Sequence, residues 1–169
     1  MDADDTIRSL REALAASPNN TALRQLLGET LLAHGHYEAA ETEFKAALKI
    51  DGQSQPLMLL LAKSYRTQGK FSAAAIVLEQ LVARGNDRAR VDLARVLLSE
   101  GDVEQAVRQY KKALEADETL HDDELSERLG VGNDEFAADA EIIDGRLRNL
   151  DGETSDDPSL VPIRSDIKF

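Results

Sequence analysis

A glycine recurs at a nearly constant interval through much of the chain. Gly35, Gly69 and Gly101 are 34 and 32 residues apart, and each stands two residues before a hydrophobic residue that begins a new amphipathic segment. Such an internal period restricts the chain to a repeat architecture in which each unit packs on the next. The apolar spacing predicts two helices per unit with a tight turn at the glycine. We therefore expect three helical hairpins, at about residues 21–51, 55–85 and 87–117.

Small residues recur at fixed positions of each unit, with larger apolar residues between them. Two antiparallel helices approach closely only where their crossing points lack bulk, and larger side chains then fill the grooves. The small positions hold Gly28, Ala40 and Ala47 in the first unit, Ala62 and Ala74 in the second, and Ala94, Ala106 and Ala113 in the third. Leu81 takes the third small position of the second unit, so we expect looser packing there.

This pattern resembles the tetratricopeptide repeat family over about residues 21–118. The resemblance implies an all-α fold, namely a tetratricopeptide-type solenoid of helical hairpins with about three repeats and with capping helices at its N- and C-terminal ends. The sequence departs from the family pattern at one position of each unit, where Arg24, Met58 and Arg90 replace an aromatic residue.

The resemblance also implies a function, because family members bind other polypeptides in a concave groove lined by the first helix of each unit. Carried over to this sequence, the groove residues are Gln25, Glu29, Lys63, Arg66, Arg88 and Arg95. Four of the six are basic, which favours a protein or peptide partner with an acidic or C-terminal carboxylate segment. The alternative is that they are solvated side chains without a partner. The lysine and asparagine clamp by which some members bind chaperone C-termini is not reproduced.

The segments that flank the repeats are predicted to cap them. Residues 1–20 contain an amphipathic helix that would cover the first repeat, and residues 119–150 are expected to form acidic capping helices. The longer of these, at 134–149, would dock on the third repeat or associate with another copy through Phe136, Ala140, Ile143, Leu147 and Leu150. Residues 151–169 have the composition of a flexible linker or tail.

The acidic residues are concentrated after the repeats. The net charge is −12, with 16 acids and 15 bases in residues 1–116 but 16 acids and 5 bases in residues 117–169. This balance argues against nucleic acid as a partner, because phosphate binding needs a basic surface. The acidic tail is expected to stay solvated. The alternative is that the acidic segment 117–157, or the tail after it, occupies the basic groove within the same molecule.

The sequence contains no pattern that indicates catalysis. It has no cysteine and no glycine-rich phosphate-binding loop, and His34 and His36 lack the further ligands that a metal site requires. We therefore expect a protein that is not an enzyme and that holds no cofactor and no metal. The acidic first residues and the lack of a long apolar run predict a cytoplasmic protein that does not enter the membrane.

A second hypothesis rests on the last five residues of the sequence. Residues 165–169, with the sequence Ser-Asp-Ile-Lys-Phe, are similar to the segment that precedes the ATPase module of AAA-type ATPases. This similarity implies that the chain is the N-terminal regulatory or substrate-recruiting domain of a larger AAA-type ATPase. Any ATPase activity would then lie outside these 169 residues.

Overall fold

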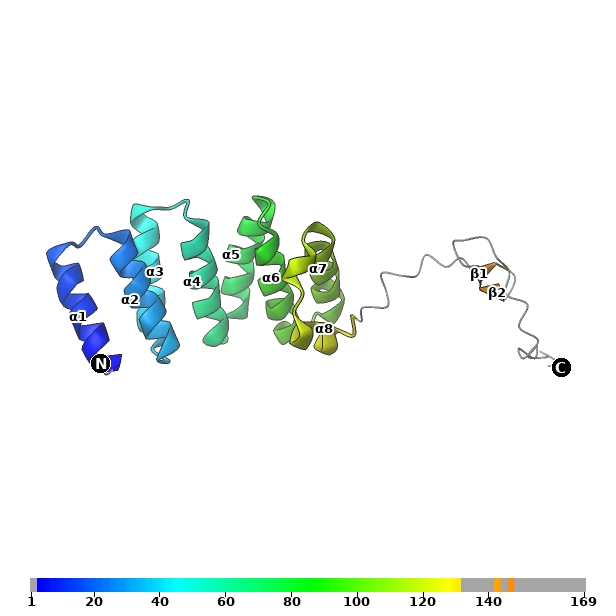
Figure 1. Cartoon of the computed structure of the whole chain (residues 1–169), viewed down its shortest axis with the longest axis horizontal. Helices are drawn as coiled ribbons and strands as arrows, with labels where there is room; N and C mark the ends of the chain where they lie inside the picture. The colour runs from blue at the N-terminus through cyan, green and yellow to red at the C-terminus, as the bar shows by residue number, and fades with distance from the viewer. Residues whose placement is uncertain (1–2, 132–141, 144–145, 148–169) are drawn as a thin grey trace. The chain divides into compact units, whose positions relative to one another are not determined.

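The computed structural model describes residues 3–131, 142–143 and 146–147. The chain divides into two units, Met1–Val131 and Gly132–Phe169. In the first unit each helix packs on its neighbours in sequence, as Figure 1 shows. Its elements are α1 (Ala3–Ala16), α2 (Thr21–Ala33), α3 (Tyr37–Ile50), α4 (Gln55–Thr67), α5 (Phe71–Ala83), α6 (Asp87–Glu100), α7 (Val103–Ala116), the short 3-10 helix η1 (Glu118–Leu120) and α8 (Asp123–Leu129). The predicted fold class is confirmed, with the three hairpins formed by α2–α3, α4–α5 and α6–α7.

The three glycines that mark the sequence period end α2, α4 and α6. Gly35, Gly69 and Gly101 have φ angles of 79°, 71° and 87°, a left-handed conformation that residues with a side chain disfavour. The amide after each glycine donates to the carbonyl five residues earlier, at 2.8, 2.9 and 2.9 Å. This hydrogen bond satisfies a carbonyl at the helix end and reverses the chain, so that the second helix begins at once.

The crossing of α2 and α3 depends on a residue without a side chain. A Cβ atom at Gly28 would lie 2.5 Å from Cε1 of Phe44, which is fully buried. The alanines at the other small positions are also buried, namely Ala40, Ala47, Ala62, Ala74, Ala94, Ala106 and Ala113. Leu81 is fully buried as well and shares a core cluster with Ala89 of α6. The small residues therefore stand at the places where the helices approach closely.

The hydrophobic core consists of three clusters that overlap along the array. The first cluster combines residues of α1 to α4, the second combines residues of α4 to α6, and the third combines residues of α6 to α8 with Val131. The first two clusters cross the boundary between consecutive hairpins, and the third joins the last hairpin to α8. A single hairpin therefore leaves part of its apolar surface uncovered unless its neighbour is folded.

Two of the three residues that replace the aromatic residue of the family pattern have a structural explanation. Arg24 of α2 forms an ion pair of 2.8 Å with Glu43 of α3. At the equivalent place in the third hairpin, Arg90 of α6 donates to Gln109 of α7 at 3.3 Å. A polar link between the two helices thus replaces an aromatic contact. Met58, at the same position of the second hairpin, is buried in the core.

The prediction of a helix at 134–149 is wrong for the four residues of this segment that the structure describes. Ile142–Ile143 and Arg146–Leu147 form two short antiparallel strands, β1 and β2, in which Ile142 pairs with Leu147. The sequence between them is Asp144-Gly145, a dipeptide that favours the two-residue turn of a hairpin. This local turn signal outweighed the apolar spacing. Phe136, Ala140 and Leu150, which the predicted docking seam also includes, lie outside the described residues.

The replacement Gly28→Ala tests the α2–α3 crossing by the sign of its effect. Alanine is the better helix former by about 1 kcal/mol, so the change would stabilise a helix with free space around it. We expect instead a loss of about 1–3 kcal/mol in the free energy of unfolding, because the new methyl group meets the buried Phe44 ring. Urea unfolding followed by circular dichroism measures this difference.

A Phe44→Leu background provides the control for this substitution. Leucine removes part of the ring that the alanine methyl group would meet, so Gly28→Ala is expected to cost less there than in the native background. Stabilisation by Gly28→Ala in the native background would contradict the proposed crossing.

Candidate functional site

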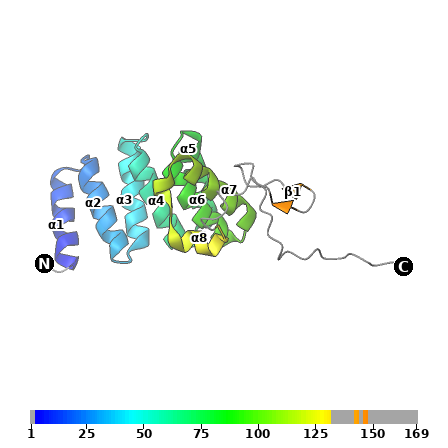
Figure 2. The same ribbon diagram turned by 45° about the vertical axis from the view of Figure 1, so that its right-hand side comes forward.

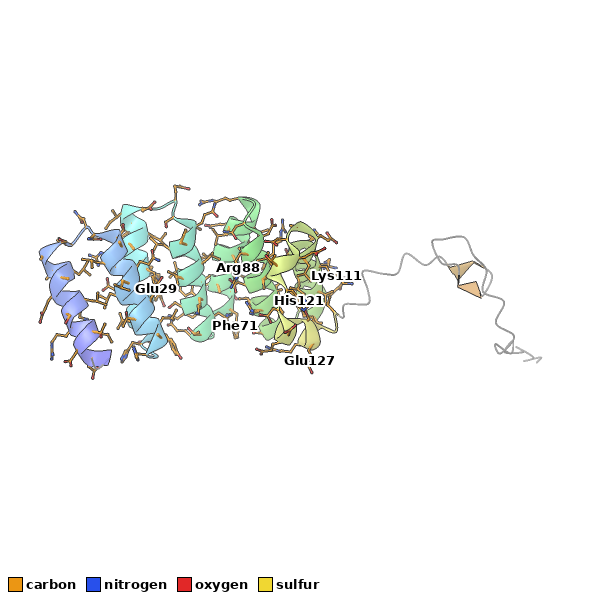
Figure 3. The ribbon with its side chains drawn as sticks, viewed as in Figure 1. Glu29, Phe71, Arg88, Lys111, His121 and Glu127 are labelled. Atoms are coloured by element: carbon orange, nitrogen blue, oxygen red, sulfur yellow. The ribbon has the colours of Figure 1, made fainter. Side chains whose placement is uncertain are left out.

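The first helices of the three hairpins lie next to one another, since α4 contacts both α2 and α6. We use the term α2/α4/α6 face for the predicted groove residues that they carry: Gln25 and Glu29 on α2, Lys63 and Arg66 on α4, and Arg88 and Arg95 on α6. Figure 3 labels Glu29 and Arg88. Glu29, Lys63 and Arg95 are 34 and 32 residues apart, so they occupy the same position of three successive repeats.

The charged residues of this face differ in whether they already have a partner. Within the described part of the chain, no ion pair involves Lys63, Arg66 or Arg88, and Lys63 and Arg88 are exposed. Glu29 accepts a hydrogen bond of 2.9 Å from Gln25 on the same helix. No carboxylate of the described residues therefore compensates the charges of Lys63, Arg66 and Arg88.

Arg95 differs from these cations because it is held by two carboxylates. One of its nitrogens lies 3.0 Å from Asp92 on the same helix, and another pairs with Asp122, which precedes α8. The Arg95 side chain is half-buried by these contacts. Sequence reasoning placed Arg95 in the groove but did not identify Asp122 as its partner, since 27 residues separate the two.

Asp122 is fixed in place by a buried tyrosine of α7. The Tyr110 hydroxyl accepts a hydrogen bond of 2.8 Å from the Asp122 backbone amide and lies 2.8 Å from the hydroxyl of Ser126. One carboxylate oxygen of Asp122 caps α8 by accepting from the Leu125 amide at 2.8 Å. These bonds hold α8 against the last hairpin, where Figure 2 also places it.

The carboxyl group of Asp122 is ionised at neutral pH. The hydrogen bond from the Leu125 amide is the largest influence and lowers the pKa of Asp122, burial opposes it, and the positive charge of Arg95 lowers the pKa of Asp122 further. The Asp122 carboxylate therefore neutralises Arg95 under ordinary conditions.

A second charged cluster fixes α4, which carries Lys63 and Arg66, to the first hairpin. Glu41 of α3 is buried and accepts hydrogen bonds from Lys45 at 2.6 Å, from Lys70 at 2.8 Å and from Gln68 at 2.9 Å. Lys45 also lies over the Tyr65 ring, 5.3 Å from its centroid. Because Gln68 and Lys70 follow α4 directly, this Glu41 cluster sets the position of α4 relative to α3.

The Glu41 cluster stabilises the charged form of the buried carboxylate. Burial by itself raises the pKa of Glu41, but the hydrogen bonds from Lys45, Lys70 and Gln68 outweigh burial and lower the pKa of Glu41 from 4.5 to about 2. The reciprocal hydrogen bond raises the pKa of Lys45. The pair is therefore ionised across the physiological range.

The described residues contain no group of three or more His, Asp and Glu side chains that would hold a metal ion. Among the same residues, no helix combines the length and the apolar composition needed to cross a bilayer.

Comparison with known families gives an independent view of the repeats. One tetratricopeptide repeat model matches residues 2–64 and 31–91, and another matches residues 87–120. The chain belongs to the tetratricopeptide repeat family. The match starts at residue 2 and thus includes α1 as well as the three hairpins. Tetratricopeptide repeats are protein–protein interaction modules and are typically non-enzymatic scaffolds. The family therefore supports a protein–protein interaction module in this chain.

Solved structures of tetratricopeptide proteins share the arrangement of the helices. A crystal structure of MamA is 25% identical, with a TM-score of 0.63 over 69% of each chain. A thermophilic tetratricopeptide protein of Thermus thermophilus is also 25% identical, with a TM-score of 0.63 over 76% of this chain and 71% of the other. MamA from Desulfovibrio magneticus RS-1, at 22% identity, shares the fold with a TM-score of 0.67 over 76% of this chain and 72% of that protein. No curated protein sequence matches the chain.

The replacement Glu41→Gln is expected to destabilise the array by about 1 kcal/mol at neutral pH, because it removes the charge that Lys45 and Lys70 contact. The folded-state pKa of Glu41 lies below its unfolded value, so its contribution is fully present above about pH 4.5. That contribution is lost as the pH falls toward 2. Urea unfolding of both proteins from pH 7 to pH 2 measures the difference.

Glu79→Gln is the matched control, because Glu79 is exposed on α5 and no ion pair of the described residues includes it. It should leave the free energy of unfolding nearly unchanged. A difference between native protein and Glu41→Gln that did not shrink on acidification would argue against the charged cluster.

The replacement Tyr110→Phe tests the attachment of α8 to the last hairpin. It leaves the Asp122 amide and the Ser126 hydroxyl without the oxygen atom that both contact, which costs about 1–3 kcal/mol for buried polar groups. Hydrogen exchange is expected to accelerate in α8 and little in α2 and α3. Equal acceleration throughout the array would contradict a local role for this hydroxyl.

Proposed function

We propose that the α2/α4/α6 face of this interaction module binds an acidic segment of another polypeptide. The observation that carries the proposal is the set of three cations, Lys63, Arg66 and Arg88, that have no ion pair within the described residues. They lie on two helices that contact each other. A partner that carries carboxylates, either in side chains or at its C-terminus, complements this charge.

The chemistry of the three cations suits such a ligand. The guanidinium groups of Arg66 and Arg88 present parallel N–H donors that match the two oxygens of a carboxylate, whereas Lys63 offers a point charge. Each exposed charge pair contributes about 0.2–1 kcal/mol, so the affinity would come from several pairs together. Both helices are held by core packing, which limits the entropy lost on binding.

Glu29 and Gln25 give the face a charge polarity along the array. They stand in the first repeat, whereas the free cations stand in the second and third repeats. A partner would therefore place its acidic residues toward α4 and α6 and a polar or basic residue toward α2. The order of charges in the partner would in this way select one direction of binding.

Two further hypotheses depend on residues outside the described ranges. The structure does not describe residues 148–169, which carry the similarity to AAA-type ATPases and the end of the acidic region, and of residues 132–147 it describes only four. Binding of the tail to the face within one molecule, and a role as the recruiting domain of such an ATPase, both stay predictions.

Charge reversal on α4 tests the proposed function. A fluorescein-labelled hexaglutamate peptide should bind the complete chain at low ionic strength, as measured by fluorescence anisotropy, and weaken as salt is added. The double variant Lys63→Glu, Arg66→Glu is expected to lower the affinity by about tenfold or more, because two attractive pairs become repulsive.

The matched control is the double variant Lys49→Glu, Arg11→Glu. It makes the same change of net charge at exposed residues of α3 and α1, which lie outside the α2/α4/α6 face. An equal loss of affinity in both double variants would show that only net charge matters and would reject the assignment of the face.

A further inference from the structure

We propose that Asp122 is an intramolecular ligand of the α2/α4/α6 face: it occupies Arg95 in the place where a partner's carboxylate would otherwise bind. This inference rests on the proposed function and adds a residue that limits which part of the face a partner reaches. In the absence of Asp122, Arg95 would be paired with Asp92 alone and one of its terminal nitrogens would be open to a ligand beside Arg88.

Arg95 can be compared with a groove residue of the second repeat, because the two have the same position within their repeats. Arg95 occupies the same position of the third repeat as Lys63 does of the second. Lys63 is exposed and has no ion pair within the described residues. The difference between the two positions is that an acidic segment follows α7 and reaches α6, whereas another helix hairpin follows the second repeat.

The position of Asp122 is supported by contacts with α7 and α8 in addition to its contact with Arg95. The backbone amide of Asp122 donates to the buried Tyr110 hydroxyl at 2.8 Å. The carboxylate oxygen of Asp122 that does not contact Arg95 caps α8. Leu125 and Leu129 of α8 are buried in the same core cluster as Val91 and Ala94 of α6. The carboxylate is thus presented to Arg95 by a folded support, at a high effective concentration.

The two carboxylates leave Arg95 with little to offer a ligand. Asp92 accepts from one terminal nitrogen of Arg95 and Asp122 from the other, so a carboxylate that pairs with both terminal nitrogens meets competition from both aspartates. An external carboxylate would have to displace Asp122, and a displaced Asp122 would no longer be neutralised by Arg95. The partner is therefore expected to contact Lys63, Arg66 and Arg88 and to leave Arg95 untouched.

The replacement Asp122→Asn separates this role from the role of Asp122 in the helix cap. The asparagine oxygen still accepts from the Leu125 amide, and the backbone bonds to Tyr110 are unchanged, but the negative charge opposite Arg95 is removed. With labelled hexaglutamate as the probe and the complete chain, we expect Asp122→Asn to raise the affinity about fivefold. The double variant Asp122→Asn, Arg95→Gln should lose this gain.

A second arm keeps the proposal testable even if Asp122→Asn fails to fold. Arg95→Gln alone should lower the affinity for hexaglutamate less than Arg66→Gln does, because Asp92 and Asp122 already compensate the charge that Arg95→Gln removes. An equal loss from Arg95→Gln and Arg66→Gln would overturn the inference, because Arg95 would then be accessible to the ligand.

The remaining outcomes distinguish this inference from the proposed function. If Arg66→Gln lowers the affinity but folded Asp122→Asn does not raise it, the proposed function stands and the role of Asp122 is rejected. A gain in Asp122→Asn that persists in the double variant with Arg95→Gln also rejects it. If the native chain does not bind hexaglutamate even at low ionic strength, the proposed function itself fails.

Discussion

Close approach of helices at residues with little or no side chain is the constraint on which the array depends. At Gly28 the Phe44 ring occupies the space that a Cβ would fill, and buried alanines stand at most of the equivalent places in the other hairpins. Because interdigitated helices have few alternative spacings, this packing fixes how α2, α4 and α6 follow one another. Core packing therefore also sets the order in which the residues of the α2/α4/α6 face follow one another.

Electrostatic contacts then refine an arrangement that apolar packing has established. The Glu41 cluster joins the first two hairpins, and the contacts of Asp122 with Arg95 and Tyr110 attach α8 to the last one. Both bring together residues that are far apart in the sequence and lie at the boundaries between helices. Such charged groups, once partly buried, must be paired, so they specify one way of docking each neighbour.

The balance between paired and unpaired cations is the basis of the function that we propose. If every charge of a surface were paired, the surface would not attract a charged ligand. If all its cations were unpaired, the cations of neighbouring repeats would repel one another. Here Lys45 and Lys70 pair with Glu41, whereas Lys63, Arg66 and Arg88 are not paired within the described residues. The acidic segment after α7 meets the same face at Arg95, so structure and binding compete for the same type of interaction.

The sequence by itself determined the repeats, their turns and the position of each residue within a repeat. Glycine at a left-handed turn and small residues at a crossing are local requirements, and they recur with the period of the fold. Only the tertiary structure decided which charges are paired, because Arg95 and Asp122 meet through the docking of α8, and Glu41 and Lys70 meet through the stacking of two hairpins. At Ile142–Ile143 and Arg146–Leu147 two local sequence signals, helical apolar spacing and a hairpin turn dipeptide, conflict, and the structure shows two short strands. Periodicity places a side chain on a face of its helix, but the neighbour that it meets there depends on how the helices pack.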